Sequence, residues 1–248
     1  MLKEVRQQSI LEELYKEGKV NVENLSVHFE ISKDTIRRDL SELEEQGILK
    51  RVYGGAIPYK WIPQASDARK TIEKNEKYLV AKKAIALMKP DTLIAIDGGT
   101  TNTLLASMIP TSMKLRVVTN SFPVVEELRK RPRIEVFFLG GLHNKESQTT
   151  VGDTVLQQLK GYHFDQCFIG AYAVDCKVGV TVPYPYDDEA NIKKLIISNS
   201  SQVNIMASIS KLEKTSNYVI CRIEELDRIL CEHPVTKAMQ QKYQNKIC

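Results

Sequence analysis

The sequence predicts an α/β protein with a small N-terminal helical domain and a larger C-terminal domain built on a mostly parallel sheet. Apolar residues recur at helical spacing up to about residue 46, and apolar strands alternate with helices from residue 76 onward. Prolines at 58 and 63 interrupt the pattern between these regions. We therefore expect domains at residues 3–58 and 76–248, joined by a linker at 59–75.

Three helices are predicted in the N-terminal domain. The first covers residues 3–17 and is followed by Gly18; Ser32 stands at the N-cap of the third, which Gly47 ends. The apolar residues at helical spacing are Val5, Ile10, Leu11 and Leu14 in the first helix, Val22, Leu25 and Phe29 in the second, and Ile36, Leu40 and Leu43 in the third. Three helices with a tight turn before the last one are typical of a helix-turn-helix.

The third helix carries two adjacent arginines, Arg37 and Arg38, on its outer side. They lie near its first turns, where recognition helices meet base edges and phosphates. Residues 1–60 hold ten Lys and Arg against eleven Asp and Glu, so bulk charge does not favour DNA binding. On charge pattern alone, a solvated helix with intrahelical ion pairs, such as one between Arg38 and Glu42, is the stronger interpretation.

A small β-hairpin is predicted at residues 48–58, ILKRVYGGAIP, because an apolar and basic alternation leads into a Gly-Gly turn. It would form the wing of a winged helix. Lys50, Arg51 and Tyr53 would then lie beside a phosphate-sized gap.

The segment ISKDTIRRDLSELEEQGILKRVYGGA resembles the signature of the DeoR family of bacterial transcriptional regulators, in order over some twenty-six residues. Tyr53 stands where that family more often has His. The resemblance favours the DNA-binding interpretation over the solvated helix that charge pattern alone favours. It implies a DNA-binding domain whose third helix enters the major groove. The residues it assigns to DNA are Ser32, Lys33, Thr35, Arg37, Arg38, Lys50, Arg51 and Tyr53.

Strands and helices alternate in the C-terminal region. Strands are predicted at 92–97, 115–120, 134–141, 164–171, 202–207, 218–223 and 227–232, and helices at 78–88, 104–109, 123–130, 153–161, 190–199 and 235–244. This alternation favours a mostly parallel sheet with helices on both faces, in which ligands bind at the carboxyl ends of the strands.

Several of the predicted strand ends have the composition of an anion site. Residues 97–102, Asp-Gly-Gly-Thr-Thr-Asn, join a strand to a helix, where glycines let backbone N–H groups approach a ligand and the helix N-terminus favours negative charge. Asn120 and Ser121 follow the next strand, and Gly140 and Gly141 the one after it. Neither G-x-x-x-x-G-K-[ST] nor G-x-G-x-x-G occurs, which leaves a small phosphorylated molecule as the expected ligand.

The C-terminal region also resembles the DeoR sensor domain, which is similar in fold to ribose-5-phosphate isomerase and binds phosphorylated sugars or their relatives. Residues 170–179 would form a further loop, and Ser208 replaces the Asp usual in the family. The residues that the resemblance assigns to the effector are Asp97, Gly98, Gly99, Thr100, Thr101, Asn120, Ser121, Gly140, Gly141, Glu189, Lys193 and Lys211.

We therefore expect a cytoplasmic regulator, more often a repressor, of a carbohydrate uptake or catabolism operon, acting on operator DNA as a dimer or larger homo-oligomer with a phosphorylated sugar as effector. The five cysteines and four histidines show no metal-ligand spacing, so neither a metal nor a cofactor is expected, and no stretch is long enough for a membrane span. The alternatives are a sugar-phosphate isomerase with an appended DNA-binding domain, using Asp97, Glu189 and Lys211, and a DNA-binding protein whose C-terminal domain only oligomerises.

Overall fold

The computed structural model describes residues 3–17, 19–45, 49–58 and 73–248. The chain divides into two compact units, Met1–Ile62 and Pro63–Cys248. Each unit has a hydrophobic core of its own. Most of the predicted linker at 59–75, including Trp61, lies outside the described residues.

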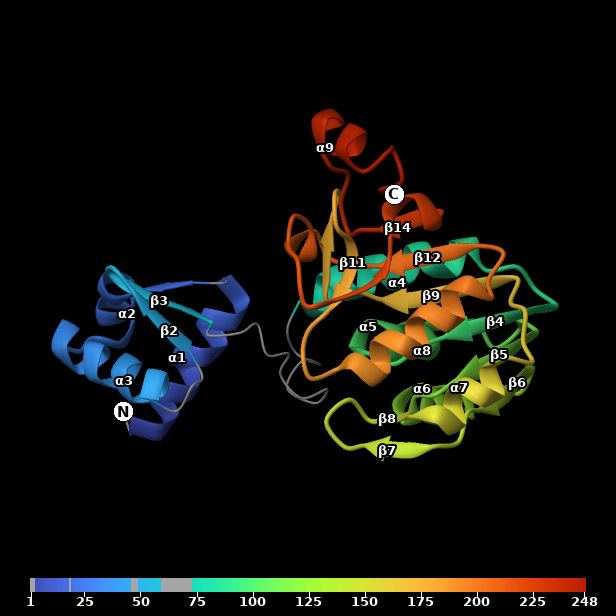
Figure 1. The fold of residues 1–248 in the computed structure, drawn as a ribbon, viewed down its shortest axis with the longest axis horizontal. Helices are drawn as coiled ribbons and strands as arrows, with labels where there is room; N and C mark the ends of the chain where they lie inside the picture. Colours follow the sequence, from blue (N-terminus) through green and yellow to red (C-terminus); the bar gives the residue numbers. More distant parts are fainter. Residues whose placement is uncertain (1–2, 18, 46–48, 59–72) are drawn as a thin grey trace. The chain divides into compact units, whose positions relative to one another are not determined.

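The N-terminal unit contains three helices and a small sheet (Figure 1). The elements are α1 (Lys3–Glu17), β1 (Val20–Asn21), α2 (Val22–Phe29), α3 (Lys33–Glu45), β2 (Leu49–Val52) and β3 (Gly55–Pro58). Strands β2 and β3 form the predicted hairpin, and β1 pairs antiparallel with β3. The mixed fold of a helix-turn-helix with a wing is therefore confirmed.

Local signals set the bounds of α2 and α3. Asn21 Oδ1 accepts the backbone N–H of Glu23 at 2.7 Å, and Ser32 Oγ accepts that of Thr35 at 3.2 Å. Glu30 ends α2 in the left-handed conformation, with φ of 54°. The predicted N-cap at Ser32 is thus confirmed, whereas Gly18 and Gly47 lie outside the described residues.

Among the described residues of this unit, the core is apolar and an ion pair lies at its edge. The apolar residues at its centre are Ile10, Leu14, Val20, Val22, Leu25, Ile36, Leu40, Leu43, Leu49 and Ala56. Arg6 of α1 donates to both carboxylate oxygens of Asp39 in α3, at 2.6 and 3.0 Å, and the Asp39 side chain is 3% exposed. This bidentate ion pair holds α1 against α3.

A six-stranded, entirely parallel sheet lies at the centre of the C-terminal unit. Its order is β14-β12-β9-β4-β5-β6. The strands are β4 (Thr92–Ile96), β5 (Leu115–Thr119), β6 (Ile134–Phe138), β9 (Gln166–Gly170), β12 (Val203–Met206) and β14 (Arg228–Leu230). The predicted parallel sheet is confirmed, and its strand order brings β4 beside β9.

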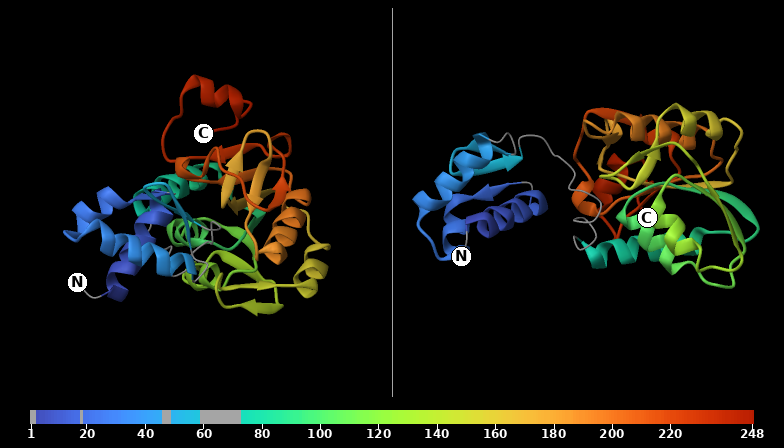
Figure 2. Two further views of the ribbon diagram at one scale, coloured as in Figure 1. Left: turned by 60° about the vertical axis from the view of Figure 1, so that its left-hand side comes forward. Right: turned by 90° about the horizontal axis from the view of Figure 1, so that it is seen from below.

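Helices cover both faces of this sheet (Figures 1 and 2). Helices α4 (Lys74–Leu87), α5 (Thr100–Met108) and α6 (Phe122–Leu128) form one layer, and α7 (Asp153–Leu159) and α8 (Asp187–Ser198) form the other. Helix α4 begins earlier than predicted, because the Glu73 carbonyl already accepts the N–H of Lys77 at 3.0 Å. The short helices η2 (Ile209–Lys211), η3 (Ile223–Glu225) and α9 (Lys237–Lys242) follow.

Two small antiparallel sheets were not predicted. One is a hairpin of β7 (Leu142–Asn144) and β8 (Thr149–Val151), and the other consists of β10 (Ala173–Asp175), β11 (Gly179–Val182) and β13 (Tyr218–Cys221). The prediction of a loop at 170–179 is therefore wrong, because β10 and β11 pair from Asp175 and Gly179 outward. Gly179 has φ of +102°, and a Cβ there would meet the Cys221 carbonyl at 2.1 Å.

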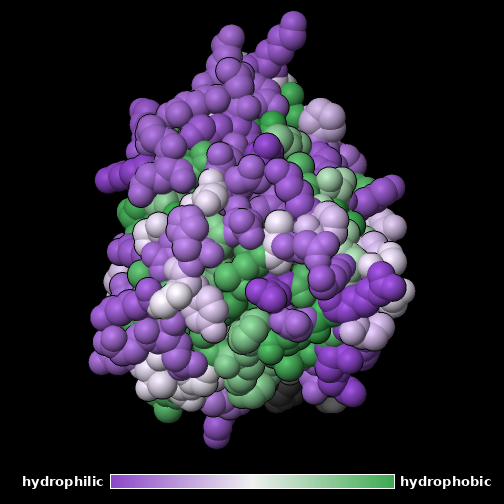
Figure 3. All heavy atoms as spheres, turned by 90° about the vertical axis from the view of Figure 1, so that its right-hand side faces the viewer, coloured by the Kyte–Doolittle hydropathy of each residue, from purple (hydrophilic) through white to green (hydrophobic). Residues whose placement is uncertain are grey.

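Figure 3 shows the surface on the right-hand side of the view in Figure 1. Hydrophilic side chains cover most of this face, and apolar side chains form smaller patches between them. Such a mixture is ordinary for a protein surface in water, and this face by itself indicates no binding site.

Candidate functional site

The outer face of α3 and the β2–β3 hairpin expose the residues predicted to contact DNA. Ile36, Leu40 and Leu43 are buried, as predicted, so Arg37 and Arg38 on the other side of the helix are exposed. The Arg37 side chain is 60% exposed. The remaining predicted DNA-binding residues are exposed or half-buried: Ser32, Lys33, Thr35, Lys50, Arg51 and Tyr53.

Several of these cations have partners at the surface. Lys33 pairs with Glu23, Arg37 pairs with Asp34 at 2.9 Å, and Arg51 Nη1 donates to Ser41 Oγ at 2.9 Å. Exposed ion pairs contribute at most about 1 kcal/mol each, so a phosphate group can replace such a partner at little cost.

Arg38 makes no hydrogen bond or ion pair with any other described residue. Glu42, its expected partner within the helix, instead pairs with Lys3 at 2.6 Å and accepts a hydrogen bond from Gln7 at 2.9 Å. The predicted Arg38–Glu42 ion pair is therefore wrong. Helix α3 instead contains an intrahelical ion pair between Arg37 and Asp34.

In the C-terminal unit, a small cavity lies at the carboxyl ends of β4 and β9. It has a volume of about 30 Å³. Eight of the twelve predicted effector residues line it or lie directly beneath it: Asp97, Gly98, Gly99, Thr100, Thr101, Glu189, Lys193 and Lys211. Helix α5 begins at its wall, so the unpaired N–H groups of the first turn face this region.

A buried ion pair between Asp97 and Lys193 forms the floor of the cavity. The Lys193 ammonium contacts Asp97 Oδ2 and donates to the Gly170 carbonyl at 3.1 Å, and the two side chains are 4% and 2% exposed. Asp97 Oδ1 accepts the N–H of Gly170 at 2.9 Å and a bond from Asn102. Burial raises the pKa of the Asp97 carboxyl, although Lys193 and Gly170 oppose the change.

Buried acceptor atoms in this cavity wall lack hydrogen-bond partners among the described residues. They are Asn102 Oδ1 and Glu189 Oε1. The other oxygen of Glu189 accepts from the Tyr172 hydroxyl at 3.4 Å, a long contact. Buried acceptors of this kind are satisfied by donors such as ligand hydroxyl groups.

The other four predicted effector residues do not line the cavity. The Asn120 amide donates to the Thr150 carbonyl at 2.8 Å, and Ser121 forms a β-bridge with Thr149. Gly140 exchanges two hydrogen bonds with the Gln158 side chain, and Gly141 packs against Val151 and Val155. Asn120, Ser121 and Gly141 contact β8 and Gly140 contacts α7, and a direct part in binding remains a prediction for all four.

Six further residues line the cavity: Asn102, Ser147, Thr149, Gly170, Ala171 and Tyr172. Asn102 belongs to the predicted anion site at 97–102, and the last three lie in or beside the segment predicted as a loop at 170–179, so only Ser147 and Thr149 had no counterpart in the sequence analysis. Ser147 and Thr149 belong to the unpredicted β7–β8 hairpin, which packs so closely that a Cβ on Gly98 would meet Thr149 Cγ2 at 2.3 Å.

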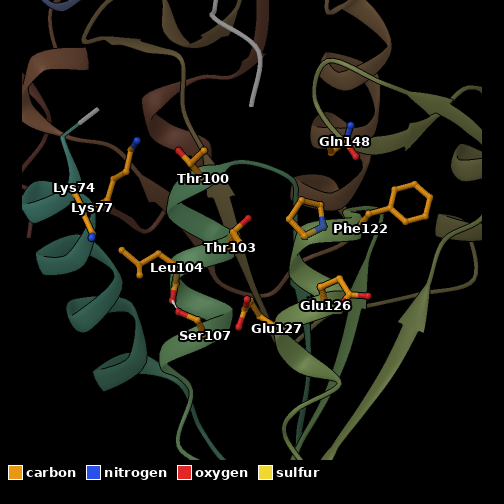
Figure 4. Close-up of a pocket in the computed structure, with 11 residues that line it drawn as sticks. Lys74, Lys77, Thr100, Thr103, Leu104, Ser107, Phe122, Glu126, Glu127 and Gln148 are labelled. Carbon is orange, nitrogen blue, oxygen red and sulfur yellow. Dashed lines mark hydrogen bonds between the residues drawn. The ribbon is translucent and has the colours of Figure 1, made fainter. Parts of the chain in front are cut away.

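A larger, open groove of about 540 Å³ runs over α5 between α4 and α6 (Figure 4). Lys74 and Lys77 stand on its α4 side and Glu126 and Glu127 on its α6 side. Thr100, at the start of α5, lines both this groove and the small cavity.

Both units match known protein families. Residues 6–60 match the DeoR-like helix-turn-helix domain, and residues 72–233 match the DeoR C terminal sensor domain. The chain belongs to the DeoR family. It is a DNA-binding transcriptional regulator with an N-terminal helix-turn-helix and a C-terminal sensor domain.

Three curated relatives illustrate the similarity. The chain is 32% identical to the HTH-type transcriptional regulator GlpR of Haloferax volcanii, over 94% of this chain and 91% of that protein. It is 30% identical to GolR of Listeria innocua (97% and 94%), an HTH-type transcriptional regulator. It is also 30% identical to the HTH-type transcriptional repressor GlcR of Bacillus subtilis (94% and 89%).

Among solved structures, the chain is similar to ribose 5 phosphate isomerase A from Neisseria gonorrhoeae, with a TM-score of 0.41 and 19% identity over 55% of this chain and 52% of that one.

In the described part of the chain, no helix is long and apolar enough to cross a membrane. Nor do the described residues include a group of three or more His, Cys, Asp or Glu placed to hold a metal ion.

Proposed function

We propose that this DeoR-family regulator represses a carbohydrate uptake or catabolism operon, acting as a homo-oligomer, and that a phosphorylated sugar bound in the cavity of the C-terminal unit changes its affinity for operator DNA. The observation that carries the proposal is the composition of the cavity. It combines the N-terminus of α5, the two lysines Lys193 and Lys211, and buried acceptor oxygens that have no donor among the described residues.

For DNA, Arg37 and Arg38 are the groups that contact guanine edges or phosphates, and Lys33, Thr35, Lys50 and Arg51 position the backbone. The exposed face of α3 supports this assignment, since its cations either have exchangeable surface partners or, like Arg38, have none among the described residues. Two-fold operators and symmetric oligomers fit this mode of binding.

For the effector, the phosphate group lies at the start of α5, where the N–H groups of the first turn and the hydroxyls of Thr100 and Thr101 donate to it and Lys211 supplies positive charge. Sugar hydroxyls donate to Glu189 and Asn102. The cavity of about 30 Å³ has the volume of roughly one water molecule. A sugar phosphate therefore requires the loops around it to open.

We assign the opening to the tip of the β7–β8 hairpin, which supplies Ser147 to the wall. Opening would break the hydrogen bond from the Tyr186 hydroxyl to Glu146 at 2.9 Å, while the bonds between Asn120 and Thr150 hold the base of the hairpin. An effector that binds the open form better shifts the protein toward it. Couplings between two binding sites are typically about 1–3 kcal/mol, or roughly 5- to 150-fold in DNA affinity.

We do not propose an enzyme. The curated relatives are named as transcriptional regulators, and Asp97, one of the three residues that an isomerase would use, is engaged by Lys193, Gly170 and Asn102. Turnover of ribose 5-phosphate or glucose 6-phosphate by the purified protein would overturn this part of the proposal.

The first experiment is binding of the full chain to DNA upstream of its own and neighbouring genes, titrated with hexose and pentose phosphates. Arg37→Ala is expected to weaken specific binding, and one sugar phosphate is expected to shift it. Lys82→Ala is the matched control, since it removes one exposed positive charge from α4 in the other unit. A protein that does not prefer these sequences over random duplex at physiological salt would refute the DNA half, and indifference to every sugar phosphate would refute the effector half.

A further inference from the structure

A carboxylate from the beginning of α4 reaches the turn that carries Lys211. Glu73 Oε2 accepts a hydrogen bond from Ser208 Oγ at 2.7 Å, and Ser208 Oγ lies 2.9 Å from Ser210 Oγ. Lys211 follows in the same turn and lines the cavity, where its ammonium donates to the Ala171 carbonyl at 2.6 Å. Glu73 therefore contacts the same turn that supplies Lys211 to the effector cavity.

The Ser208–Lys211 turn is also held by a second carboxylate. Both oxygens of Glu232 accept the backbone N–H of Ile209, at 3.1 and 2.9 Å. This contact uses the backbone, so it fixes the turn whatever the state of Lys211. Glu73 differs from Glu232 because it contacts the side chains of the turn and not its backbone, and because the positive charge of Lys211 acts on its carboxylate.

Glu73 carries a negative charge in this environment. Burial raises the pKa of its carboxyl, but the hydrogen bonds from Ser208 and Ser210 and the positive charges of Lys211 and Lys77 outweigh burial and leave the pKa below its ordinary value. The bond to Ser208 thus holds one anion at a position three residues from Lys211 in the same turn. A phosphate group entering the cavity would be a second anion served by the same lysine.

The position of Glu73 in the chain gives this competition a route to the DNA-binding unit. Glu73 is the N-cap of α4, which is the first described helix of the C-terminal unit. Its backbone is left-handed, with φ of 51° and ψ of 45°, a conformation that costs energy for a residue with a Cβ. The contact with Ser208 therefore holds a strained junction, which can relax when the side chain is released.

We propose that Glu73 is an internal competitor of the effector phosphate for Lys211, and that its release from Ser208 on effector binding alters the start of α4 and with it the affinity of the N-terminal unit for DNA. This inference rests on the proposed function of the cavity and adds the residue that links it to the rest of the chain.

The test uses the full chain with three substitutions. Glu73→Gln keeps the shape and removes the charge, Ser208→Ala removes the hydroxyl that holds Glu73, and Glu76→Gln is the matched control, with the same change of charge one turn further along α4. Binding of inorganic phosphate, glucose 6-phosphate, fructose 6-phosphate and ribose 5-phosphate is measured by calorimetry, and DNA affinity is measured without any of them.

We expect Glu73→Gln to bind the phosphate compounds about fivefold more tightly than the wild type, since one neighbouring like charge is gone. Ser208→Ala should shift affinity in the same direction and less, and Glu76→Gln should not. Without any phosphate compound, Glu73→Gln should already have the DNA affinity that the wild type reaches with its sugar phosphate.

Unchanged or weaker phosphate binding by both Glu73→Gln and Ser208→Ala overturns the competition, and tighter binding with unaltered DNA affinity overturns the link to the N-terminal unit. In both cases the wild type still binds a sugar phosphate, so the proposed function stands. A wild type that binds none of the four compounds overturns the proposed effector site and this inference together.

Discussion

Replacing Lys193 by Met tests whether the Asp97–Lys193 pair is the structural centre of the sensor cavity. The substitution leaves the Asp97 carboxylate, which is 2% exposed, with the Gly170 N–H and the Asn102 amide as its donors. Removing one partner of a buried ion pair costs about 3–5 kcal/mol. For a unit of this size, each kcal/mol lowers Tm by roughly 2–4 °C, so the transition of the C-terminal unit should fall by roughly 6–20 °C.

Differential scanning calorimetry of the full chain measures this change, because the two units have separate cores and are expected to give separate transitions. Lys194→Met is the control, since Lys194 is the exposed neighbour on the same helix. The double variant Lys193→Met with Asp97→Asn should recover most of the loss, because it removes the unpaired charge. A loss below about 1 kcal/mol in the single variant, or no recovery in the double one, would refute the reasoning.

Three further predictions concern separate parts of the chain. If Arg37 and Arg38 contact bases, Arg37→Ala and Arg38→Ala should each weaken specific DNA binding by about 1–3 kcal/mol. If they contact phosphates, each substitution should reduce the slope of log affinity against log salt concentration by about 1. Filter-binding titrations at several salt concentrations distinguish the two. Leu40→Ala should destabilise the N-terminal unit by about 2–5 kcal/mol, without moving the C-terminal transition in the calorimeter; a shift of both would contradict separate cores. Burial raises the pKa of the Cys167 thiol to about 12, so a thiol reagent at pH 8 should modify exposed Cys248 quickly and Cys167 only on unfolding, as mass spectrometry of the labelled peptides would report.

The acid range gives one more expectation. Burial raises the pKa of Asp97 in the folded protein, so the native state binds more protons than the unfolded chain between the ordinary carboxyl pKa of 3.8 and the raised value. The contribution of the raised Asp97 pKa to the free energy of unfolding is therefore fully present below pH 3.8. It is lost as the pH rises through the pKa that Asp97 has in the folded protein. In urea titrations across this range, Asp97→Asn should remove that pH-dependent component, and an identical profile in the variant would contradict it.

The spacing of apolar residues in the sequence was sufficient to predict the helices and the parallel sheet. Ile36, Leu40 and Leu43 are buried as their spacing predicts, and each strand of the sheet is a short apolar run bounded by turn residues. The strands from Ala173 to Val182 escaped prediction because all of β11 is buried and it has no alternation to read. The family resemblance implied a loop at 170–179, whereas Gly179 lies where β11 passes close to the backbone of Cys221.

The candidate site was predictable where its residues are neighbours in the sequence. The Asp97–Thr101 loop was found because strand, glycines and helix follow one another. Ser147 and Thr149 carry no local signal, since only the folding of their hairpin against Gly98 brings them to the cavity. Asp39 was missed for a similar reason: its inward position makes sense only with Arg6 of another helix beside it.

The pairing of β4 with β9 also has a consequence for how the protein matures during synthesis. Ile94 lies opposite Gln166 and Ile96 opposite Phe168, so Asp97 and Gly170 meet only after some seventy intervening residues have been made and the loop between the strands has closed. The helix-turn-helix, in contrast, is complete within the first 58 residues. Because domains fold as units from the N-terminus during translation, we expect the nascent chain to carry a folded DNA-binding unit before it can sense any ligand.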